Sequence, residues 1–343
     1  MTDRLTVAVA SSKGTVDFFD VASGEKLGRV DGLTAEPHEL TWDRGRRRAY
    51  LSHTYRSGFY NGAGEKGHEI SAIDVDAMVL LSVYDVAPYI SPHGVEYNRH
   101  DDLIYAGVEE SSPGRNGLVV VAPDGRVVGN IPTRATNTHW LAFATDGRTA
   151  YTSHKEYPNL SVLDLSTRKQ IDEIPLPGGA EEVDVSRDGR WLFAVTPSLP
   201  AQRGAHEPAR TRNDVPRLVK IDLASGNVVG EAELGAGISA IRATGDGRVL
   251  VGQLPLGSPD AGTDGFLHVV DTESMVVKAS LALERGPFTS RITDDDTTAF
   301  VANTIAGTVS VVDLGTYCVT RTLSSTPDPS WGGTHGIVVF AGA

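Results

Sequence analysis

The sequence predicts an all-β fold, a seven-bladed β-propeller of four-stranded antiparallel blades. Strand-like segments that alternate apolar and polar residues recur about every 45 to 55 residues, the period of propeller blades. An aspartate at the end of its third strand counts seven units, and a turn after its first strand recurs in five of them. Neither end of the chain holds a whole unit, as expected when the two ends together complete one blade.

The clearest unit extends from Gly286 to Thr322. Strand-like residues fill 298–303, 307–313 and 319–323, and a turn rich in Gly, Asp, Asn or Ser follows each segment. With an opening segment before residue 298, the unit contains four short strands.

The two markers set the register of the other units. The third strand ends in the aspartates Asp20, Asp74, Asp164, Asp222, Asp271 and Asp313, with Asp124 as a degenerate seventh copy. The turn after the first strand contains Asp146-Gly147, Asp188-Gly189 and Asp246-Gly247, and is looser at Asp43 and at Asp294. Asp and Gly tolerate the positive φ of a tight hairpin turn, so these words indicate antiparallel neighbours.

The two ends of the chain predict how the ring closes. The N-terminus supplies three strands, at 5–11, 14–20 and 25–30, and the C-terminus supplies one first strand at 336–340. Pairing the last strand with the N-terminal blade would remove exposed sheet edges. We therefore expect residues 1–343 to form a single propeller domain.

Composition narrows the classes of partner. The formal charge of −13 argues against nucleic acid and anionic membrane surfaces, which require basic patches. No apolar run approaches the length of a membrane span or of a signal peptide, so we expect a cytoplasmic protein. One cysteine, Cys318, excludes an intramolecular disulfide and a thiolate-rich metal site. A closed ring needs no partner for stability, which favours a monomer or a weak homo-oligomer.

Four histidines occupy the same place in successive units: His38, His93, His139 and His335. Each begins a first strand, and first strands line the central channel of a propeller, so the four imidazoles should meet at one mouth of the channel. This convergence predicts a metal site. Imidazole ligands favour a divalent transition metal, Fe, Zn, Ni, Cu or Co, over Mg or Ca.

Other polar residues fall on the same face. The equivalent positions of the remaining blades are Glu181 or Glu182, Ser239, and Phe288 or Thr289. His53, His154 and Glu182 are candidates for moving protons, since imidazoles and shifted carboxyls serve as general acids and bases. Metal-bound imidazoles usually donate their other ring nitrogen to an acceptor, and the candidates for that role are Glu109, Glu110 and Glu156.

Three insertions between second and third strands, at 55–68, 198–216 and 255–265, should rise on this face and contact a substrate. Arg212 in the second insertion is a candidate for binding an anionic group such as a carboxylate. The aromatic candidates for contact with a small-molecule substrate are Tyr55, Tyr60, Tyr89, Trp140, Tyr157, Phe288 and Trp331. Packing within the blades is the alternative role of Trp140 and Trp331.

Three motifs of this chain resemble the YVTN-repeat, lactonase-like family of seven-bladed propellers. They are Phe300-Val301-Ala302-Asn303, Thr308-Val309-Ser310-Val311-Val312-Asp313-Leu314 and Pro92-His93-Gly94-Val95. That resemblance implies the fold, but its members include lactonases, lyases, metalloenzyme domains and binding surfaces. Pro-His-Gly is also a frequent spelling in this family, so a turn preference is the alternative explanation of His93. The spacing of the four histidines is similar to the four-histidine iron site of the carotenoid-cleavage oxygenases.

The function predicted is a metal-dependent enzyme of lyase, hydrolase or isomerase type, acting on a small organic molecule at the channel mouth. The chain contains no Gly-x-Ser-x-Gly elbow, phosphate-binding loop or His-Glu-x-x-His helix. Two alternatives stay open: a non-haem Fe(II) oxygenase with four histidine ligands, and a propeller that binds a ligand or a protein without catalysis.

Overall fold

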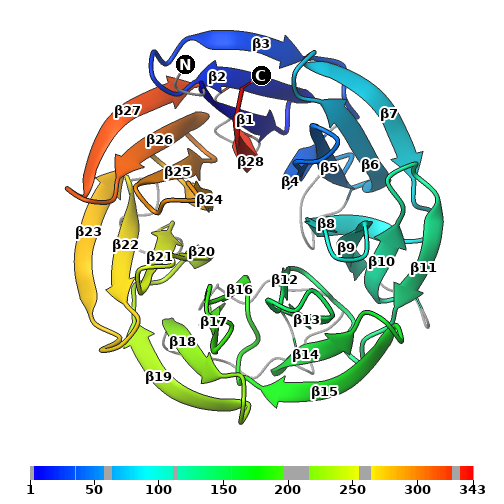
Figure 1. Ribbon diagram of the computed structural model, residues 1–343, viewed down its shortest axis with the longest axis vertical. Helices are drawn as coiled ribbons and strands as arrows, with labels where there is room; N and C mark the ends of the chain where they lie inside the picture. Colours follow the sequence, from blue (N-terminus) through cyan, green and yellow to red (C-terminus); the bar gives the residue numbers. More distant parts are fainter. Residues whose placement is uncertain are drawn as a thin grey trace.

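The computed structural model describes residues 4–34, 36–57, 64–110, 115–155, 157–196, 216–254, 264–326 and 333–342. Seven four-stranded antiparallel sheets stand around a central axis (Figure 1). The regular elements of this part of the chain are all strands. The predicted seven-bladed β-propeller is therefore confirmed.

The blades are numbered here by chain order, and the first strand of each faces the axis (Figure 1). Blade 1 contains β4 (Pro37–Asp43), β5 (Arg48–Tyr55), β6 (Lys66–Asp74) and β7 (Val79–Asp85). Blade 2 contains β8 (Ile90–Asn98), β9 (Leu103–Glu110), β10 (Gly117–Val121) and β11 (Val127–Ile131). Blade 3 contains β12 (Leu141–Phe143), β13 (Thr149–Thr152), β14 (Asn159–Asp164) and β15 (Lys169–Pro175).

The second half of the ring repeats the pattern. Blade 4 contains β16 (Val183–Val185), β17 (Trp191–Thr196), β18 (Arg217–Asp222) and β19 (Asn227–Glu233). Blade 5 contains β20 (Ile238–Ala243), β21 (Arg248–Gln253), β22 (Gly265–Asp271) and β23 (Val277–Leu283). Blade 6 contains β24 (Pro287–Ile292), β25 (Thr298–Asn303), β26 (Thr308–Asp313) and β27 (Cys318–Ser324).

The closing blade joins the two ends of the chain, as predicted. It contains β28 (Thr334–Ala341), β1 (Leu5–Ser11), β2 (Thr15–Asp20) and β3 (Lys26–Val30), in the spatial order β28-β1-β2-β3. The C-terminal strand lies innermost and pairs antiparallel with β1, for example Val339 with Val7. The ring therefore closes by hydrogen bonds between segments more than 300 residues apart.

The aspartates that mark the third strands act in the turns that follow. Oδ1 of Asp164 accepts hydrogen bonds from the backbone N–H groups of Ser166 and Thr167, and Oδ1 of Asp313 accepts them from Gly315 and Thr316. An Asp side chain that bonds the backbone two or three residues on closes an Asx turn. The aspartate repeats because every blade makes this turn.

Most of the hydrophobic core lies between neighbouring blades. One cluster of buried apolar side chains fills each of the seven junctions in the described structure. At the junction of the closing blade with blade 1, Phe18 packs with Leu40 and Leu51. Since each blade shares its core with both neighbours, loss of one junction weakens two blades.

His53 lies near the end of the second strand of blade 1, and His154 lies at the equivalent place just after the second strand of blade 3. Both are fully buried. Nδ1 of His154 bonds the carbonyl of Asn137 at 3.1 Å, and Nε2 bonds the hydroxyl of Ser161 at 2.8 Å. His53 makes the same pair of bonds, to the carbonyl of Thr34 and the hydroxyl of Ser71. These imidazoles tie the loop before a first strand to the third strand of the same blade.

The search for membrane-spanning segments found no helix of sufficient length and hydropathy in the described residues.

The closing strand should tolerate no side chain at Gly336. A Cβ there would lie 2.5 Å from the backbone carbonyl oxygen of His38 and from the amide nitrogen of Leu40, so β28 would have to move away from β4. We expect Gly336→Ala to lower the free energy of unfolding by about 1–3 kcal/mol, the usual cost of overpacking a core. Urea unfolding of the two proteins measures the difference.

Gly45→Ala is the matched control, because a Cβ at Gly45 would meet only a carboxylate oxygen of Asp43, at 3.4 Å. It should unfold at nearly the same urea concentration as the wild type. Equal stabilities of the Gly336 variant and this control would contradict the close approach of β28 and β4.

His154 should make the stability of the metal-free protein depend on pH. Burial lowers its pKa to about 4, so between pH 6.5 and 4 the unfolded chain takes up a proton there that the folded protein does not. Stability is therefore full above pH 6.5 and falls as the pH drops toward 4, by up to roughly 3 kcal/mol from this group. In His154→Asn that part of the decrease should disappear.

Asn303 provides the control, because it occupies the equivalent place in blade 6 and donates to Ser310 at 2.9 Å without titrating. Asn303→Ala should change the free energy of unfolding by the same amount at every pH. Chemical unfolding across this pH range would contradict the assignment if His154→Asn kept the wild-type pH dependence.

Candidate functional site

The four histidines of the repeat meet at one mouth of the channel. The rings of His38 and His335 lie 3.8 Å apart between centroids, and those of His93 and His139 lie 3.7 Å apart. His38 and His93 join the two pairs, since their Nε2 atoms are 2.7 Å apart. The convergence expected from the register is therefore present in the structure.

Glycines after two of these histidines let neighbouring blades come this close. The N–H of Gly94 donates to the carbonyl of His139 at 3.0 Å, and a Cβ at Gly94 would lie 2.9 Å from that oxygen. Gly336 meets the backbone of His38 in the same way. In each His-Gly pair, the glycine therefore holds the preceding histidine against the backbone of the registered histidine in the next blade.

Two buried serines form hydrogen bonds with the backbone of these axis-facing segments. The Ser52 hydroxyl donates to the carbonyl of His93 at 2.7 Å and accepts from the N–H of Glu39 at 3.1 Å. Ser153 does the same two units later, donating to the carbonyl of Glu181 at 2.9 Å and accepting from the N–H of Trp140 at 3.1 Å. Each serine connects the first strand of its own blade to that of the next.

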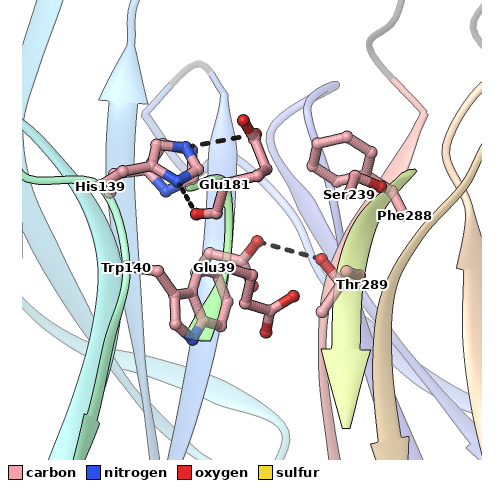
Figure 2. A pocket seen from close by; sticks show the side chains of 10 residues that line it. Glu39, His139, Trp140, Glu181, Ser239, Phe288 and Thr289 are labelled. Atoms are coloured by element: carbon pink, nitrogen blue, oxygen red, sulfur yellow. Dashed lines mark hydrogen bonds and ion pairs between the residues drawn. The ribbon is translucent and has the colours of Figure 1, made fainter. Parts of the chain in front are cut away.

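The tautomer of His139 follows from its contacts. Its Nδ1 lies 2.7 Å from the backbone carbonyl of Glu181, which can only accept, so Nδ1 carries the proton. Its Nε2 therefore presents a lone pair, buried and without a hydrogen-bond partner in the described structure. The Nε2 atom lies 3.3 Å from Oε1 of Glu109. It lies 3.6 Å from Oε1 of Glu181 (Figure 2).

Carboxylates outnumber ammonium groups in this part of the site. Glu39, Glu109 and Glu181 are each less than 8% exposed. The Nζ of Lys155 lies 3.1 Å from Glu181 and 3.6 Å from Glu109. Burial raises the pKa of the Glu109 carboxyl against the opposing charge of Lys155. A bound cation would offset the cost of burying these three carboxyl groups together.

Burial lowers the pKa of three imidazoles, those of His38, His93 and His139, well below the usual value. Neighbouring histidines and the ammonium group of Lys155 act in the same direction. The three rings are therefore neutral at neutral pH, the state in which imidazole binds metals.

Two sets of three side chains have the spacing of metal ligands. The first, called here the Glu109 set, contains His93, Glu109 and His139, and the second, called the Glu39 set, contains His38, Glu39 and His335. Within each set, one ligand atom from every residue lies within 4.8 Å of the other two, and all the residues are buried. Buried His and Glu side chains that could hold a metal ion are thus present at the mouth.

A small cavity of about 10 Å³, room for about one water molecule, lies among residues of the axis-facing segments (Figure 2). Trp140 and Phe288 form its apolar walls, and Ser239 adds a buried hydroxyl without a hydrogen-bond partner in the described structure. The residues that line it are Glu39, His93, His139, Trp140, Glu181, Glu182, Ser239, Ala240, Phe288 and Thr289.

Charged side chains fill the channel behind Trp140. Arg242 and Arg291 lie 5.6 and 5.9 Å from the Trp140 ring. Arg291 reaches from blade 6 to Glu96 in blade 2, at 3.6 Å. Arg242 lies 3.1 Å from Oε1 of Glu182. Guanidinium groups from two blades thus cross the channel on the far side of the cavity.

The proton-transfer candidates occupy different environments. Glu182 lines the cavity, and burial raises its pKa to about 8 against the opposing charges of Arg242 and Arg291. His53 and His154 do not line the cavity. In each of them, one ring nitrogen bonds a backbone carbonyl and the other bonds a serine hydroxyl. Alternate residues of a strand point to opposite sides, so Ser52 and Ser153 face the next blade while the histidines point away from it.

Glu109 lies on the Nε2 side of the imidazoles of His93 and His139. The sequence placed it as an acceptor for the second ring nitrogen of His93, but its Oε1 lies 3.9 Å from the Nε2 of His93 and closer to the Nε2 of His139. Nδ1 of His93 has no hydrogen-bond partner in the described part of the chain. Glu109 thus belongs to a group of side chains that could hold a metal ion.

The aromatic candidates divide into two groups. Trp140 and Phe288 line the cavity, and the Phe288 ring lies 4.9 Å from that of His335. Tyr55 is buried, and its hydroxyl donates to Oε2 of Glu109. Tyr89 packs against the core between blades 1 and 2, and Tyr157 lies edge-on to His154, so neither lines the cavity.

Five candidates lie outside the described residues or side chains: Tyr60, Glu110, Glu156, Arg212 and Trp331. Of these, Glu110 belongs to β9 by its backbone alone.

Sequence reasoning gave no role to Glu39 or Lys155, and it named Glu181 only as the alternative to Glu182 at the registered position. Glu39 and Glu181 stand directly beside a registered position, Glu39 after His38 and Glu181 before Glu182. Lys155 follows His154, in a segment quoted for its histidine. Adjacency to a registered position was the signal available for Glu39.

No protein-family model matches this chain, and no curated protein matches its sequence. Among solved structures, the chain is similar to hydrazine synthase of Kuenenia stuttgartiensis, with a TM-score of 0.67 and 15% sequence identity over 87% of this chain and 89% of that chain. At this identity the similarity supports the shared propeller fold alone. The resemblance to the YVTN-repeat family stays a prediction based on the words that carry it.

Proposed function

We propose that this protein is a metal-dependent enzyme that acts on a small organic molecule at the channel mouth, by hydrolase, lyase or isomerase chemistry. The metal is a divalent transition ion, and the Glu109 set supplies its ligands. The observation that carries the proposal is the buried lone pair of His139, held between two carboxylate groups.

A lone pair that faces carboxylate oxygens is unfavourable unless a cation or a proton lies between them. The distance of 3.3 Å from Nε2 of His139 to Oε1 of Glu109 is close to the separation of two ligands at about 2.1 Å from one tetrahedral ion. The backbone carbonyl that fixes the His139 tautomer is the kind of partner that metal-bound imidazoles usually have.

A metal bound there would supply Lewis acidity toward a carbonyl or hydroxyl oxygen, or would lower the pKa of a bound water. The side chains around the cavity would bind the substrate and hold a proton. Trp140 and Phe288 would exclude water and pack on apolar parts of the substrate. Ser239 would hydrogen-bond a polar group, and Glu182, with its raised pKa, would hold a proton close to the cavity at neutral pH.

A non-haem Fe(II) oxygenase is the second candidate. Two histidines and one carboxylate form the ligand set of many such enzymes, and the Glu109 set has that composition. Turnover with and without dioxygen separates the two functions, because a hydrolase, lyase or isomerase works equally well under anaerobic conditions.

Metal analysis of untagged protein tests the proposal first. We expect a bound transition metal, and we expect the double variant His93→Ala, His139→Ala to lose it. The affinity should fall by more than about 100-fold, since even the outer partners of metal ligands contribute about 10–100-fold. Elemental analysis after reconstitution with Fe(II), Zn or Ni measures the loss.

A second double variant, His100→Gln with His268→Gln, is the matched control. It also removes two imidazoles, but neither lines the cavity nor belongs to a ligand set. It should keep the metal. Absence of metal in the wild type after reconstitution would reject the proposal.

Tyr55 should strengthen metal binding by fixing Glu109. Its hydroxyl donates to Oε2, which leaves Oε1 directed at the histidines. Tyr55→Phe should weaken metal affinity by about 10-fold, the scale of outer partners. Tyr84→Phe, which removes a hydroxyl that bonds the carbonyl of Pro123, should leave the affinity unchanged in the same titration. Equal affinities of all three proteins would show that Tyr55 has no such role.

A further inference from the structure

The Glu39 set forms a second group of ligands beside the first. His38, Glu39 and His335 are at least nine-tenths buried, and they come from β4 and β28, which belong to neighbouring blades. The set repeats the composition of the Glu109 set, two imidazoles and one carboxylate.

Glu39 has no arginine or lysine within ion-pair distance among the described residues. Its Oε1 accepts a hydrogen bond from the Thr289 hydroxyl at 3.0 Å and lies 2.8 Å from Nδ1 of His335. Its Oε2 is buried without a hydrogen-bond partner in the described structure. A carboxylate that is 1% exposed and only partly satisfied is costly to bury, and a bound cation would offset that cost.

The spacing fits two ligands of one ion. Two metal–ligand bonds of about 2.1 Å at a right angle place the ligand atoms about 3.0 Å apart. Oε1 of Glu39 and Nδ1 of His335 are separated by 2.8 Å. The same distance is that of a hydrogen bond, so it does not by itself choose between a proton and a metal.

The two sets face one space. Glu39 of one set and His93 and His139 of the other line the same cavity. The sets also touch directly through the Nε2 atoms of His38 and His93, 2.7 Å apart. Ions held by both sets would therefore be close neighbours, as in two-metal hydrolytic sites, where the ions lie about 3.5–4 Å apart.

We infer that the channel mouth is a two-metal centre, with one divalent transition ion in the Glu109 set and a second in the Glu39 set. This inference rests on the proposed function, because the first ion is the one proposed above. The second ion would extend the site to substrates with two oxygen atoms to bind, or to one oxygen shared by both ions.

Metal stoichiometry tests the inference. Metal-free protein is loaded with Zn(II) alone, freed of excess ion, and analysed for zinc per chain. We expect two equivalents in the wild type and about one in each of two double variants, Glu39→Gln with His335→Gln and Glu109→Gln with His139→Gln. The double variant His100→Gln, His268→Gln should keep two, and circular dichroism checks that every protein is folded.

Different results separate this inference from the proposed function. One equivalent in the wild type, kept by the Glu39, His335 variant and lost by the Glu109, His139 variant, would overturn the second site and leave the first. One equivalent lost in both variants would mean a single ion shared by the four histidines, and would also overturn the inference. No zinc in the wild type would reject both.

Anomalous diffraction from zinc-soaked crystals of the wild type decides the question if a variant fails to fold. Two peaks at the channel mouth, about 3.5–4 Å apart, are expected. A single peak would overturn the inference.

Discussion

The structure depends on the convergence of seven innermost segments on one narrow axis. Blades can meet there only where their backbones come into contact, and the glycines after His93 and His335 permit that approach. Histidine side chains placed beside those contacts have no room to turn away from one another. Ring closure therefore brings together residues nearly 300 positions apart, and the site exists only while the ring is closed.

Burial then determines the chemical state of what has been assembled. The imidazoles lose their protons because water is excluded, and the carboxyl groups of Glu109 and Glu181 are buried beside them around the ammonium group of Lys155. A folded protein normally avoids such an arrangement because each unpaired buried charge costs several kcal/mol. Its presence at the mouth is the physical reason to expect a cation there, independently of any similarity to other proteins.

The sequence was sufficient for the fold because its two markers have local causes. The aspartates close Asx turns and the Asp-Gly pairs form hairpins, so each can be found without knowledge of distant contacts. The histidine register was also correct, since first strands line the axis in any propeller. The faces of the second strands were harder to predict. In Ser52-His53 the serine, not the histidine, points toward the next blade.

The remaining site residues could not be predicted from the sequence because their roles depend on tertiary contacts. The role of Glu109 depends on which nitrogen of His139 carries the proton, and that is set by a carbonyl 42 residues away in the chain. The position of Lys155 depends on carboxylates from blades 2 and 4. Glu39 was not predicted because successive residues of a regular strand point to opposite sides. A β-bulge between Pro37 and Leu40 interrupts this alternation, so both His38 and Glu39 contribute to the site.

The arginine layer behind Trp140 has a consequence for traffic through the ring. In the described structure Arg291 spans the channel from blade 6 to blade 2, so its ion pair with Glu96 crosses the passage behind Trp140. A molecule that passed through the ring would first have to separate these two side chains, so the same ion pair that joins blades 6 and 2 also sets how open the passage is.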